Sequence, residues 1–297
     1  MISSELEILA PAKINLVLRV GSRRADGYHG IETAMQKLAL ADCLSFKKTA
    51  AGCGVELRCS GAVLPEDENN LVFKAALVFF DYTGISGNVE IHLEKRIPVA
   101  AGLGGGSSDA AAALSGLNSL FGTNLSLGDL RELGASLGAD VPFFIGTNAA
   151  AFATGIGTTL KNIEPLGDCW IVLVNPGIPV STKWVYDNFR LTTGAKPYML
   201  PGCSKSFAGE LLPGMPTILA VCNAESPFND LEAVTARRYG VIQSIKEELA
   251  GQGACLAMMS GSGPTVFGIF RRRAEAAASY TAFRELYSGV FLTQPVS

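Results

Sequence analysis

PVAAGLGGGSS, residues 98–108, separates a strand-like segment from an alanine-rich helical one. Before it, apolar and polar residues alternate over 89–94, which predicts a half-buried strand. After it, apolar residues recur at three- and four-residue spacing over 110–121, which predicts a helix. Ser107, Ser108 and Asp109 are residue types that cap helix starts, so we expect the helix to begin there.

The glycines of this stretch predict a phosphate-binding loop. Glycine lets the backbone approach an anion, and the first turn of the following helix adds unpaired N–H donors and a positive dipole end. A glycine-rich turn with no ligand is the alternative. Three consecutive glycines, Gly104 to Gly106, followed by two hydroxyls favour phosphate. The loop matches neither the P-loop pattern nor the dinucleotide fingerprint.

Composition narrows the function classes. The 297 residues, 48% of them hydrophobic, are enough for two ordinary domains. The net charge is −3 and the basic pairs are scattered, so we expect no nucleic-acid partner. The uncharged segment 141–160 is too polar and too rich in glycine to span a membrane, and Met1 to Lys13 has no signal-peptide core. A soluble cytoplasmic protein is the expectation.

The cysteines do not predict a metal site. There are seven, an odd number, with no Cys-x-x-Cys pair, and only His29 and His92 could join them as ligands. We therefore expect free thiols in a reducing compartment and no protein-built metal centre.

The sequence of the N-terminal half predicts both strands and helices. Alternation over 14–20 predicts a strand on which Lys13 and Asn15 share a face. Asn69 or Asn70 caps a predicted helix that ends at Gly84, and Ser126 with Asp129 forms a predicted capping box for a helix closed by Gly138.

The C-terminal half predicts an α+β sandwich of the ferredoxin-like kind. A polar junction over 161–167 predicts a domain boundary, which gives domains 1–163 and 164–297. The expected elements are strands at 170–174, 255–259, 265–270 and 290–293, and helices at 182–189, 229–249 and 274–287.

Four segments together resemble the GHMP kinase superfamily of galactokinase, homoserine, mevalonate and phosphomevalonate kinases. They are PAKINL at 11–16, the glycine loop at 98–108, GADVPF at 138–143 and SGSGP at 260–264. Their order and spacing match that superfamily along nearly the whole chain. ADGYH at 25–29, Glu32, Thr33, Gln36 and NDLE at 229–232 narrow the resemblance to kinases of a cytidine-diphosphate-linked polyol.

The resemblance implies a two-domain α+β fold with an N-terminal ribosomal-protein-S5-like domain and a C-terminal ferredoxin-like domain. It implies ATP-dependent phosphorylation of the tertiary 2-hydroxyl of a methylerythritol unit, in the non-mevalonate route to isoprenoids. The ATP-binding residues it implies are Pro98, Ala101, Gly102, Gly104, Gly105, Gly106, Ser107 and Ser108.

Lys13 and Asp140 are the implied catalytic residues. Phosphoryl transfer needs alignment, charge neutralisation and a means of deprotonating or orienting the attacking hydroxyl. Asp140 is the candidate base; its alternative role is to cap the helix start before Pro142. Lys13 would hydrogen-bond the hydroxyl, keep Asp140 charged and stabilise the developing alkoxide; its alternative is a solvated strand residue.

The resemblance also implies substrate-binding residues at Asn15, Tyr28, His29, Tyr186, Gly261 and Ser262. Aromatic rings can sandwich a flat pyrimidine, and a ring nitrogen can read its polar edge. The alternatives are an ordinary turn for Tyr28 and His29, a core position for Tyr186 and a hairpin loop for 260–263. Thr158 departs from the family pattern, where an acidic residue is frequent.

Mg²⁺ is implied by ATP, held mostly by phosphates and water, because no acidic cluster predicts a protein ligand. We expect small-molecule partners only, and a monomer or weak homodimer. The rival interpretations are another GHMP kinase of the homoserine or mevalonate type, an inactive ligand sensor on the same fold, and a dinucleotide-dependent oxidoreductase. Another GHMP kinase is disfavoured by Tyr28, His29 and Asn229, and an inactive sensor by the presence of Lys13 and Asp140. An oxidoreductase is disfavoured by the missing dinucleotide fingerprint.

Overall fold

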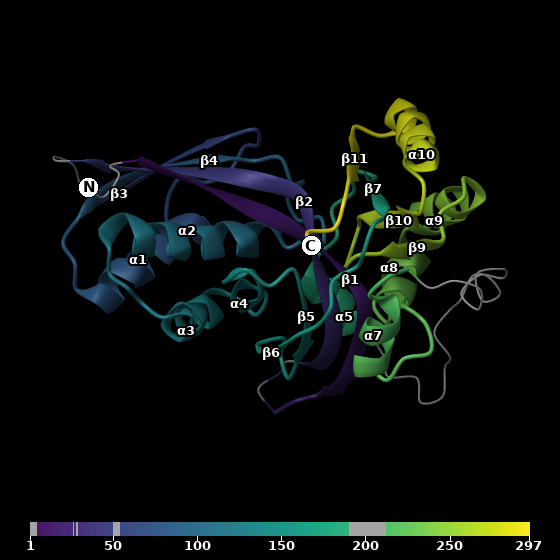
Figure 1. The fold of residues 1–297 in the computed structure, drawn as a ribbon, viewed down its shortest axis with the longest axis horizontal. Coiled ribbons are helices and arrows are strands. Elements are labelled where there is room, and N and C mark those ends of the chain that lie inside the picture. The colour runs from purple at the N-terminus through teal and green to yellow at the C-terminus, as the bar shows by residue number, and fades with distance from the viewer. Residues whose placement is uncertain (1–4, 26, 28, 50–53, 190–211) are drawn as a thin grey trace. The chain divides into compact units, whose positions relative to one another are not determined.

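The computed structural model describes residues 5–25, 27, 29–49, 54–189 and 212–297. Two compact units divide the chain: residues 1–12, 40–99 and 104–148 form unit 1, and residues 13–39, 100–103 and 149–297 form unit 2. Strands β1 (Glu5–Arg23) and β2 (His29–Thr49) contribute residues to both (Figure 1). These units do not coincide with the predicted segments 1–163 and 164–297, because the chain enters each unit more than once.

Unit 1 contains a mixed sheet. β4 (Asn88–Glu94) lies between β3 (Val55–Ser60), to which it is parallel, and the second half of β2, to which it is antiparallel. The predicted alternation over 89–94 is confirmed, since Val89, Ile91 and Leu93 are buried in the core.

The described residues of unit 1 also form four helices: α1 (Leu71–Thr83), α2 (Gly105–Phe121), α3 (Leu127–Leu137) and α4 (Val141–Phe144). α2 contacts the other three, and its alanines are buried around most of the helix, which explains the alanine-rich sequence. The predicted caps are confirmed: Asn70 accepts from Val72 N, and Ser126 and Asp129 form a capping box.

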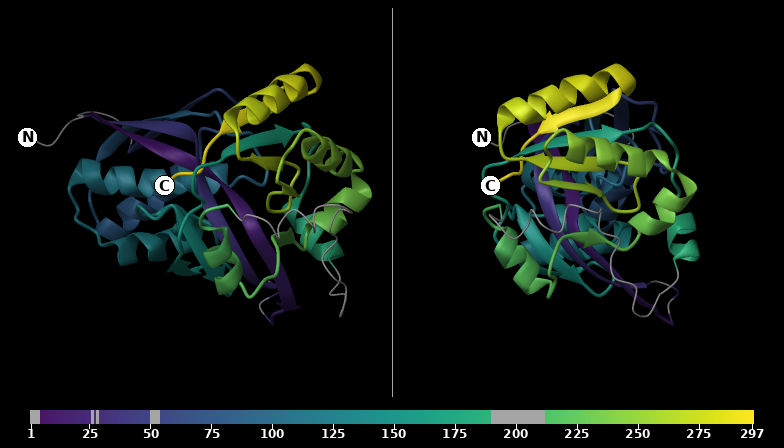
Figure 2. Two further views of the ribbon diagram at one scale, coloured as in Figure 1. Left: turned by 45° about the vertical axis from the view of Figure 1, so that its right-hand side comes forward. Right: turned by 90° about the vertical axis from the view of Figure 1, so that its right-hand side faces the viewer.

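Unit 2 contains a four-stranded antiparallel sheet in the order β11-β7-β10-β9, with β7 at Trp170–Asn175, β9 at Leu256–Met259, β10 at Val266–Phe270 and β11 at Gly289–Thr293. Two helices, α9 (Val241–Gly251) and α10 (Arg273–Leu286), contact this sheet (Figure 2). Along the chain the first, second, third and fourth strands take the spatial order 4-1-3-2, so the predicted ferredoxin-like sandwich is confirmed.

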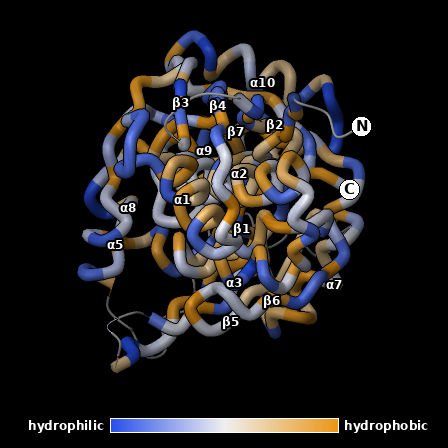
Figure 3. Tube along the Cα trace, turned by 90° about the vertical axis from the view of Figure 1, so that its left-hand side faces the viewer, coloured by the Kyte–Doolittle hydropathy of each residue, from blue (hydrophilic) through white to orange (hydrophobic). Residues whose placement is uncertain are grey.

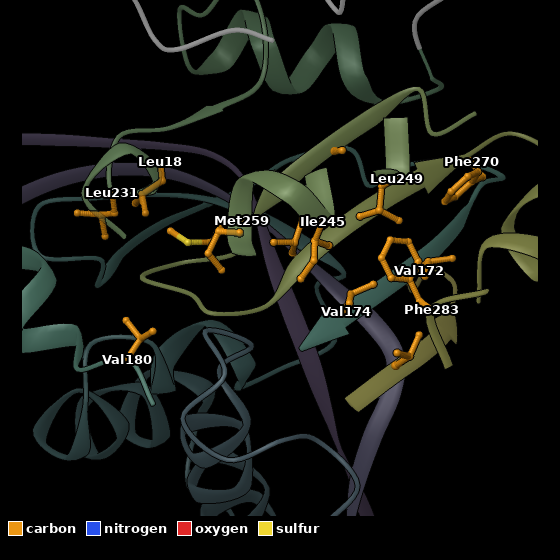
Figure 4. Close-up of a cluster of buried hydrophobic side chains, with 14 of the residues drawn as sticks. Leu18, Val172, Val174, Val180, Leu231, Ile245, Leu249, Met259, Phe270 and Phe283 are labelled. Atoms are coloured by element: carbon orange, nitrogen blue, oxygen red, sulfur yellow. The ribbon is translucent and has the colours of Figure 1, made fainter. Parts of the chain in front are cut away.

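The core of this sandwich is built from side chains of the sheet and of the helices that contact it (Figure 4). Val172 and Val174 from β7, Phe270 from β10, Leu249 from α9 and Phe283 from α10 are fully buried. Leu18 of β1 joins the same cluster, so strand β1 is packed against the sandwich core within unit 2.

The rest of unit 2 is organised by the long strands. β1 pairs in parallel with the short strand β8 (Phe228–Asn229). The first half of β2 pairs with β5 (Ala150–Thr154), which forms a hairpin with β6 (Thr159–Asn162). Thr158 lies in the turn of that hairpin. The remaining helices of the described chain are α5 (Thr182–Asn188), α7 (Met215–Val221) and α8 (Glu232–Arg238).

The predicted single helix over 229–249 is wrong. The structure divides that range into β8, α8 and α9, with an interruption at Tyr239 and Gly240. Tyr239, with φ −125° and ψ 84°, leaves the helical region. The apolar periodicity continues through the break because both helices contribute to one core, so the pattern alone did not reveal it.

No helix in the described part of the chain is long and apolar enough to cross a membrane. Figure 3 shows hydrophilic residues interrupting the hydrophobic ones along the chain trace. Residues 141–160 include α4, β5 and the start of β6.

The packing of α2 against β2 generates a test. A Cβ on Gly116 would lie 2.5 Å from the Phe46 ring, whose side chain is fully buried. We expect Gly116→Ala to lower the free energy of unfolding by about 1–3 kcal/mol through overpacking, despite the higher helix propensity of alanine. Urea unfolding measures the change.

Gly128→Ala is the matched control, because that glycine is exposed on α3 and its added Cβ would meet nothing nearer than 3.4 Å. This variant should be as stable as wild type or slightly more stable. Equal effects of the two substitutions would contradict the packing account.

Candidate active site

The predicted phosphate loop continues directly into α2. The helix begins at Gly105, and Gly104 occupies the N-cap position with φ 72°, a left-handed conformation that favours glycine. Ser107 and Ser108 therefore lie inside the first turn, so the predicted helix start at Ser107 to Asp109 is wrong. The N–H groups of the first turn have no intrahelical acceptor, which suits an anion. The Ser108 hydroxyl is buried and finds no hydrogen-bond partner within the described residues.

In unit 2, residues 100–103 are held tightly against the loop between β9 and β10. A Cβ on Gly102 would lie 2.3 Å from the Ser260 carbonyl oxygen, and the Gly102 φ is 77°. The Ser260 hydroxyl donates to the Gly102 carbonyl at 2.9 Å. Thr265 N donates to the Ala101 carbonyl. Glycine is required at position 102 by both space and backbone angle.

Strand β1 places Lys13 and Asn15 on one face, as predicted. Lys13 Nζ donates to Asn15 Oδ1 at 2.7 Å, and Asn15 Nδ2 donates to Thr33 Oγ1 at 2.8 Å. The Thr33 hydroxyl donates onward to the Val17 carbonyl at 2.7 Å. All three side chains are buried, which excludes the alternative of a solvated lysine. These hydrogen bonds fix the direction of the Asn15 amide. The sequence pattern did not predict that Thr33 holds it.

Asn15 is also close to the second predicted substrate segment. A Cβ on Gly261 would lie 3.6 Å from Asn15 Oδ1 and 3.1 Å from the Gly102 carbonyl. Ser262 Oγ lies 2.8 Å from Thr182 Oγ1 at the start of α5. Unit 2 thus brings together Lys13, Asn15, Gly102, Gly261 and Ser262, which the sequence places in three separate segments.

Asp140 lies in unit 1 at the start of α4. It occupies the N-cap position but its side chain makes no capping hydrogen bond, so the alternative role as a helix cap has no support in the geometry. The preceding Gly138 adjoins the phosphate loop, since a Cβ there would lie 4.0 Å from Ser107 Oγ. Unit 1 thereby places the segment containing Asp140 beside the first turn of α2.

Two of the aromatic residues predicted to bind substrate are neighbours in unit 2. The His29 and Tyr186 ring centroids lie 5.8 Å apart at 34°, and Phe189, which sequence reasoning missed, meets His29 edge-on at 6.1 Å. His29 Nδ1 lies 3.0 Å from the Gly21 carbonyl, which can only accept, so Nδ1 carries the proton. Tyr28 lies outside the described residues.

A buried ionic cluster lies beneath the start of α2. Lys95 Nζ contacts Asp42 Oδ2 at 2.5 Å and Asp109 Oδ2 at 2.7 Å, and all three side chains are at most 5% exposed. Asp42 Oδ1 also accepts from the N–H groups of Arg96 and Ile97. A Cβ on Gly105 would lie 3.2 Å from Lys95 Nζ, so the cluster directly underlies the phosphate loop. The sequence did not predict it, because its members are up to 67 residues apart.

One ammonium cannot neutralise two buried carboxylates. Burial raises the pKa of Asp109 to about 7, against the opposing effect of Lys95 and with a further increase from Asp42. Asp109 Oδ1 has no hydrogen-bond partner in the described structure, so it is the oxygen free to carry a proton.

The described residues contain no group of three or more His, Cys, Asp or Glu side chains that could hold a metal ion. The five cysteines within the described ranges, at positions 43, 59, 169, 222 and 255, are free thiols. The unpartnered Ser108 hydroxyl at the phosphate loop fits a magnesium ion coordinated mainly by phosphate oxygens and water.

The raised pKa of Asp109 generates a test. The folded protein retains the Asp109 proton up to about pH 7, whereas the unfolded chain releases it near pH 4. The stability associated with this group is therefore present below about pH 4 and is lost as the pH rises to about 7. The side chain in Asp109→Asn cannot ionise. The free energy of unfolding of this variant minus that of wild type should therefore be larger at pH 8 than at pH 5. Urea unfolding at both pH values measures the difference.

Asp81→Asn, an exposed position on α1, serves as the control and should follow the wild-type pH dependence. Parallel pH curves for Asp109→Asn and wild type would contradict the assignment of a buried, proton-bearing Asp109.

Two curated relatives resemble this chain over nearly its full length. The 4-diphosphocytidyl-2-C-methyl-D-erythritol kinase of Syntrophotalea carbinolica is 45% identical over 97% of this chain and 98% of its own. The enzyme of the same name from Syntrophus aciditrophicus is 45% identical over 93% of this chain and 94% of its own. A crystal structure of 4-(cytidine 5'-diphospho)-2C-methyl-D-erythritol kinase is 33% identical, covers 98% of this chain and 100% of its own, and superposes with a TM-score of 0.79.

Two family models match the chain. The GHMP kinases N terminal domain matches residues 70–148, which include the phosphate loop and Asp140. The GHMP kinases C terminal model matches residues 216–289, which include β8, α8 and the loop between β9 and β10. The chain therefore belongs to the GHMP kinase family and, within it, to the group of 4-diphosphocytidyl-2-C-methyl-D-erythritol kinases.

Proposed function

We propose that the protein transfers the γ-phosphoryl group of ATP to the 2-hydroxyl of 4-diphosphocytidyl-2-C-methyl-D-erythritol, forming the 2-phosphate and ADP. The observation that carries this proposal is the identity of 45% to kinases of that name over nearly the whole of both chains. The buried Lys13–Asn15–Thr33 chain of hydrogen bonds supports it, because a phosphoryl acceptor needs a polar group held in one orientation.

Lys13 and Asn15 bind the acceptor end in this proposal. The Lys13 ammonium donates to the attacking oxygen and stabilises the negative charge that develops on it. Asn15 Oδ1 already accepts from Lys13, and its amide is directed by Thr33, so this pair costs little reorganisation when substrate binds.

Asp140 is the proposed base. Its carboxylate accepts the hydroxyl proton late in the transfer, as the oxygen–phosphorus bond forms and the bond to the ADP oxygen breaks. General-base assistance of this kind contributes about 10²–10⁴-fold to the rate.

The loop 98–108 binds the ATP phosphates in this proposal. Backbone N–H groups of Gly105, Gly106 and Ser107 at the first turn of α2 donate to phosphate oxygens, and the helix dipole favours their charge. The Ser108 hydroxyl donates to a phosphate oxygen or ligates magnesium. Bound Mg²⁺ supplies charge neutralisation on the leaving phosphates.

The cytidine end is assigned to His29, Tyr186 and Tyr28. Because His29 Nδ1 donates to Gly21, its Nε2 is an acceptor in the neutral ring and suits the exocyclic amine of cytosine. His29 and Tyr186 are already in contact, whereas a base inserted between two rings needs roughly 7 Å between them, twice a carbon contact distance. The base would therefore stack on an outer face of this pair.

Gly261 and Ser262 complete the acceptor end, where the glycine permits close approach of substrate to Asn15. We further propose a cytoplasmic enzyme with small-molecule partners only, acting as a monomer or weak homodimer.

Substrate identity is tested by incubation with magnesium-ATP and, separately, 4-diphosphocytidyl-2-C-methyl-D-erythritol, homoserine and mevalonate. We expect ADP release coupled to phosphorylation of the cytidylyl compound alone, because only that substrate supplies a pyrimidine for the His29 ring. Phosphorus NMR of the product identifies the phosphorylated oxygen. Phosphorylation of homoserine or mevalonate but not of the cytidylyl compound would overturn the proposal. Binding of the cytidylyl compound without any turnover would favour a ligand sensor.

The catalytic assignment is tested by Lys13→Met and Asp140→Asn, which keep side-chain size and remove charge. We expect turnover to fall about 10²–10⁴-fold in each variant. Steady-state kinetics and circular dichroism separate loss of chemistry from loss of fold.

Lys161→Met and Asp81→Asn make the same chemical changes at exposed positions and should retain wild-type turnover. Near-normal activity of the Lys13 and Asp140 variants would remove both residues from the proposed mechanism.

A further inference from the structure

The NDLE segment, residues 229–232, has no part in the chemistry proposed above, yet it makes a dense set of buried contacts in unit 2. Asn229 ends strand β8, and the segment continues into α8. Asn229 and Glu232 are 8% and 7% exposed, respectively. Two polar side chains this deeply buried so close together need a specific set of partners.

Asn229 uses all of its hydrogen-bonding groups to hold backbone. Its amide nitrogen donates to the carbonyls of Met259 and Gly261, both at 2.8 Å. Its amide oxygen accepts from Leu231 N at 3.0 Å. The side chain thus bridges the end of β9 and the glycine of the proposed acceptor-binding loop, and no other residue type of this size has two donors and an acceptor in this arrangement.

Two side chains of helix α8 also hydrogen-bond to the backbone between Met259 and Ser262. Glu232 Oε2 accepts from Met259 N at 2.8 Å, while its other oxygen pairs with the buried Lys246 ammonium of α9. Thr235 Oγ1 donates to the Ser262 carbonyl at 3.1 Å. Side chains of Asn229, Glu232 and Thr235 therefore hold four backbone groups between Met259 and Ser262.

The same segment is attached on its other side to strand β1. Phe228 and Asn229 pair with Val17 and Leu18, and Asp230 N donates to the Leu18 carbonyl at 2.9 Å. Asp230 Oδ2 accepts from Val20 N at 2.8 Å. Strand β1 is the element that presents Lys13 and Asn15, so the segment connects that strand to the loop that contains Gly261.

We propose that Asn229, supported by Glu232 and Thr235, is a positioning residue that sets the distance between the Gly261–Ser262 backbone and Asn15 of strand β1, and thereby aligns the phosphoryl acceptor. This role rests on the proposed function. It predicts that loss of Asn229 acts on the acceptor end of the reaction and leaves nucleotide binding intact, because the Ser260–Gly102 contact does not involve Asn229.

The test compares Asn229→Asp and Asn229→Ala with wild type. The aspartate is isosteric but directs a carboxylate oxygen at two carbonyls, whereas alanine removes the bridge. We expect kcat/KM for the cytidylyl substrate to fall about 10–100-fold in both, because misplacement by about 1 Å costs rate on this scale. The KM for ATP and the Kd of a non-hydrolysable ATP analogue should stay within about twofold of wild type.

A pH profile sharpens the test. In Asn229→Asp, protonation of the new carboxyl restores one donor, so activity relative to Asn229→Ala should rise as the pH is lowered from 8 to 5. A residue that merely stabilised the fold would lower the melting temperature without this split between acceptor and nucleotide kinetics.

Asn118→Asp is the matched control. The Asn118 side chain also makes three hydrogen bonds, two to the backbone of Leu125 and one to the Thr123 hydroxyl. It lies near the far end of α2, about 15 Å along the helix from Ser108. This variant should be less stable and kinetically normal. Should the Asn229 variants not accumulate as folded protein, Thr235→Val replaces them. It removes the hydroxyl that bonds to the Ser262 and Leu231 carbonyls, and the expected fall in kcat/KM for the cytidylyl substrate is about 3–10-fold.

The outcomes separate the two proposals. An inactive wild-type chain would overturn the proposed function. If wild type is active, two results would overturn the positioning role alone. One is an unchanged kcat/KM for the cytidylyl substrate in the folded Asn229 variants, and the other is a loss of nucleotide affinity as large as the loss of that kcat/KM.

Discussion

The absence of a side chain at Gly102 is the constraint on which the phosphate loop depends in unit 2. The Ser260 carbonyl occupies the place that a Cβ would take, 2.3 Å away, and the backbone there is left-handed. Lys13 N donates to the Leu103 carbonyl, so residues 100–103 are held between strand β1 and the loop after β9. Three segments that are distant in sequence are thereby fixed by one close backbone contact and a few hydrogen bonds.

Buried polar and charged side chains do the remaining positioning. Lys95 holds Asp42 and Asp109 beneath the start of α2, while Lys246 holds Glu232 behind the acceptor loop. Buried ion pairs contribute little net stability compared with apolar packing, but breaking one is costly, so they specify one arrangement. Both clusters lie directly behind proposed ligand-binding backbone, which is where a single arrangement matters for catalysis.

Local sequence signals predicted individual elements well wherever the signal and the packing agreed. The capping box at Ser126, the strand over 89–94 and the ferredoxin-like sandwich were all predictable from periodicity and turn residues. The start of α2 was mispredicted, because Gly104 takes a left-handed cap while the serines have the stronger statistical preference for caps. The helix over 229–249 was mispredicted because the apolar spacing does not change at the interruption, since α8 and α9 pack into the same core.

The sequence by itself determined the family and the shared face of Lys13 and Asn15, because these depend on motifs and on the two-residue period of a strand. It also predicted that the loop 98–108 binds phosphate. Only the tertiary structure decided how the motifs support one another. Asn229 bonds to Met259 and Gly261, and Lys95 bonds to Asp42, across 30 to 53 residues of chain. Partners at such separations are selected by packing of whole elements, and no local propensity encodes them. The NDLE segment was recognisable from sequence as a family signature, but its contacts with strand β1 and the acceptor loop became visible only in the fold.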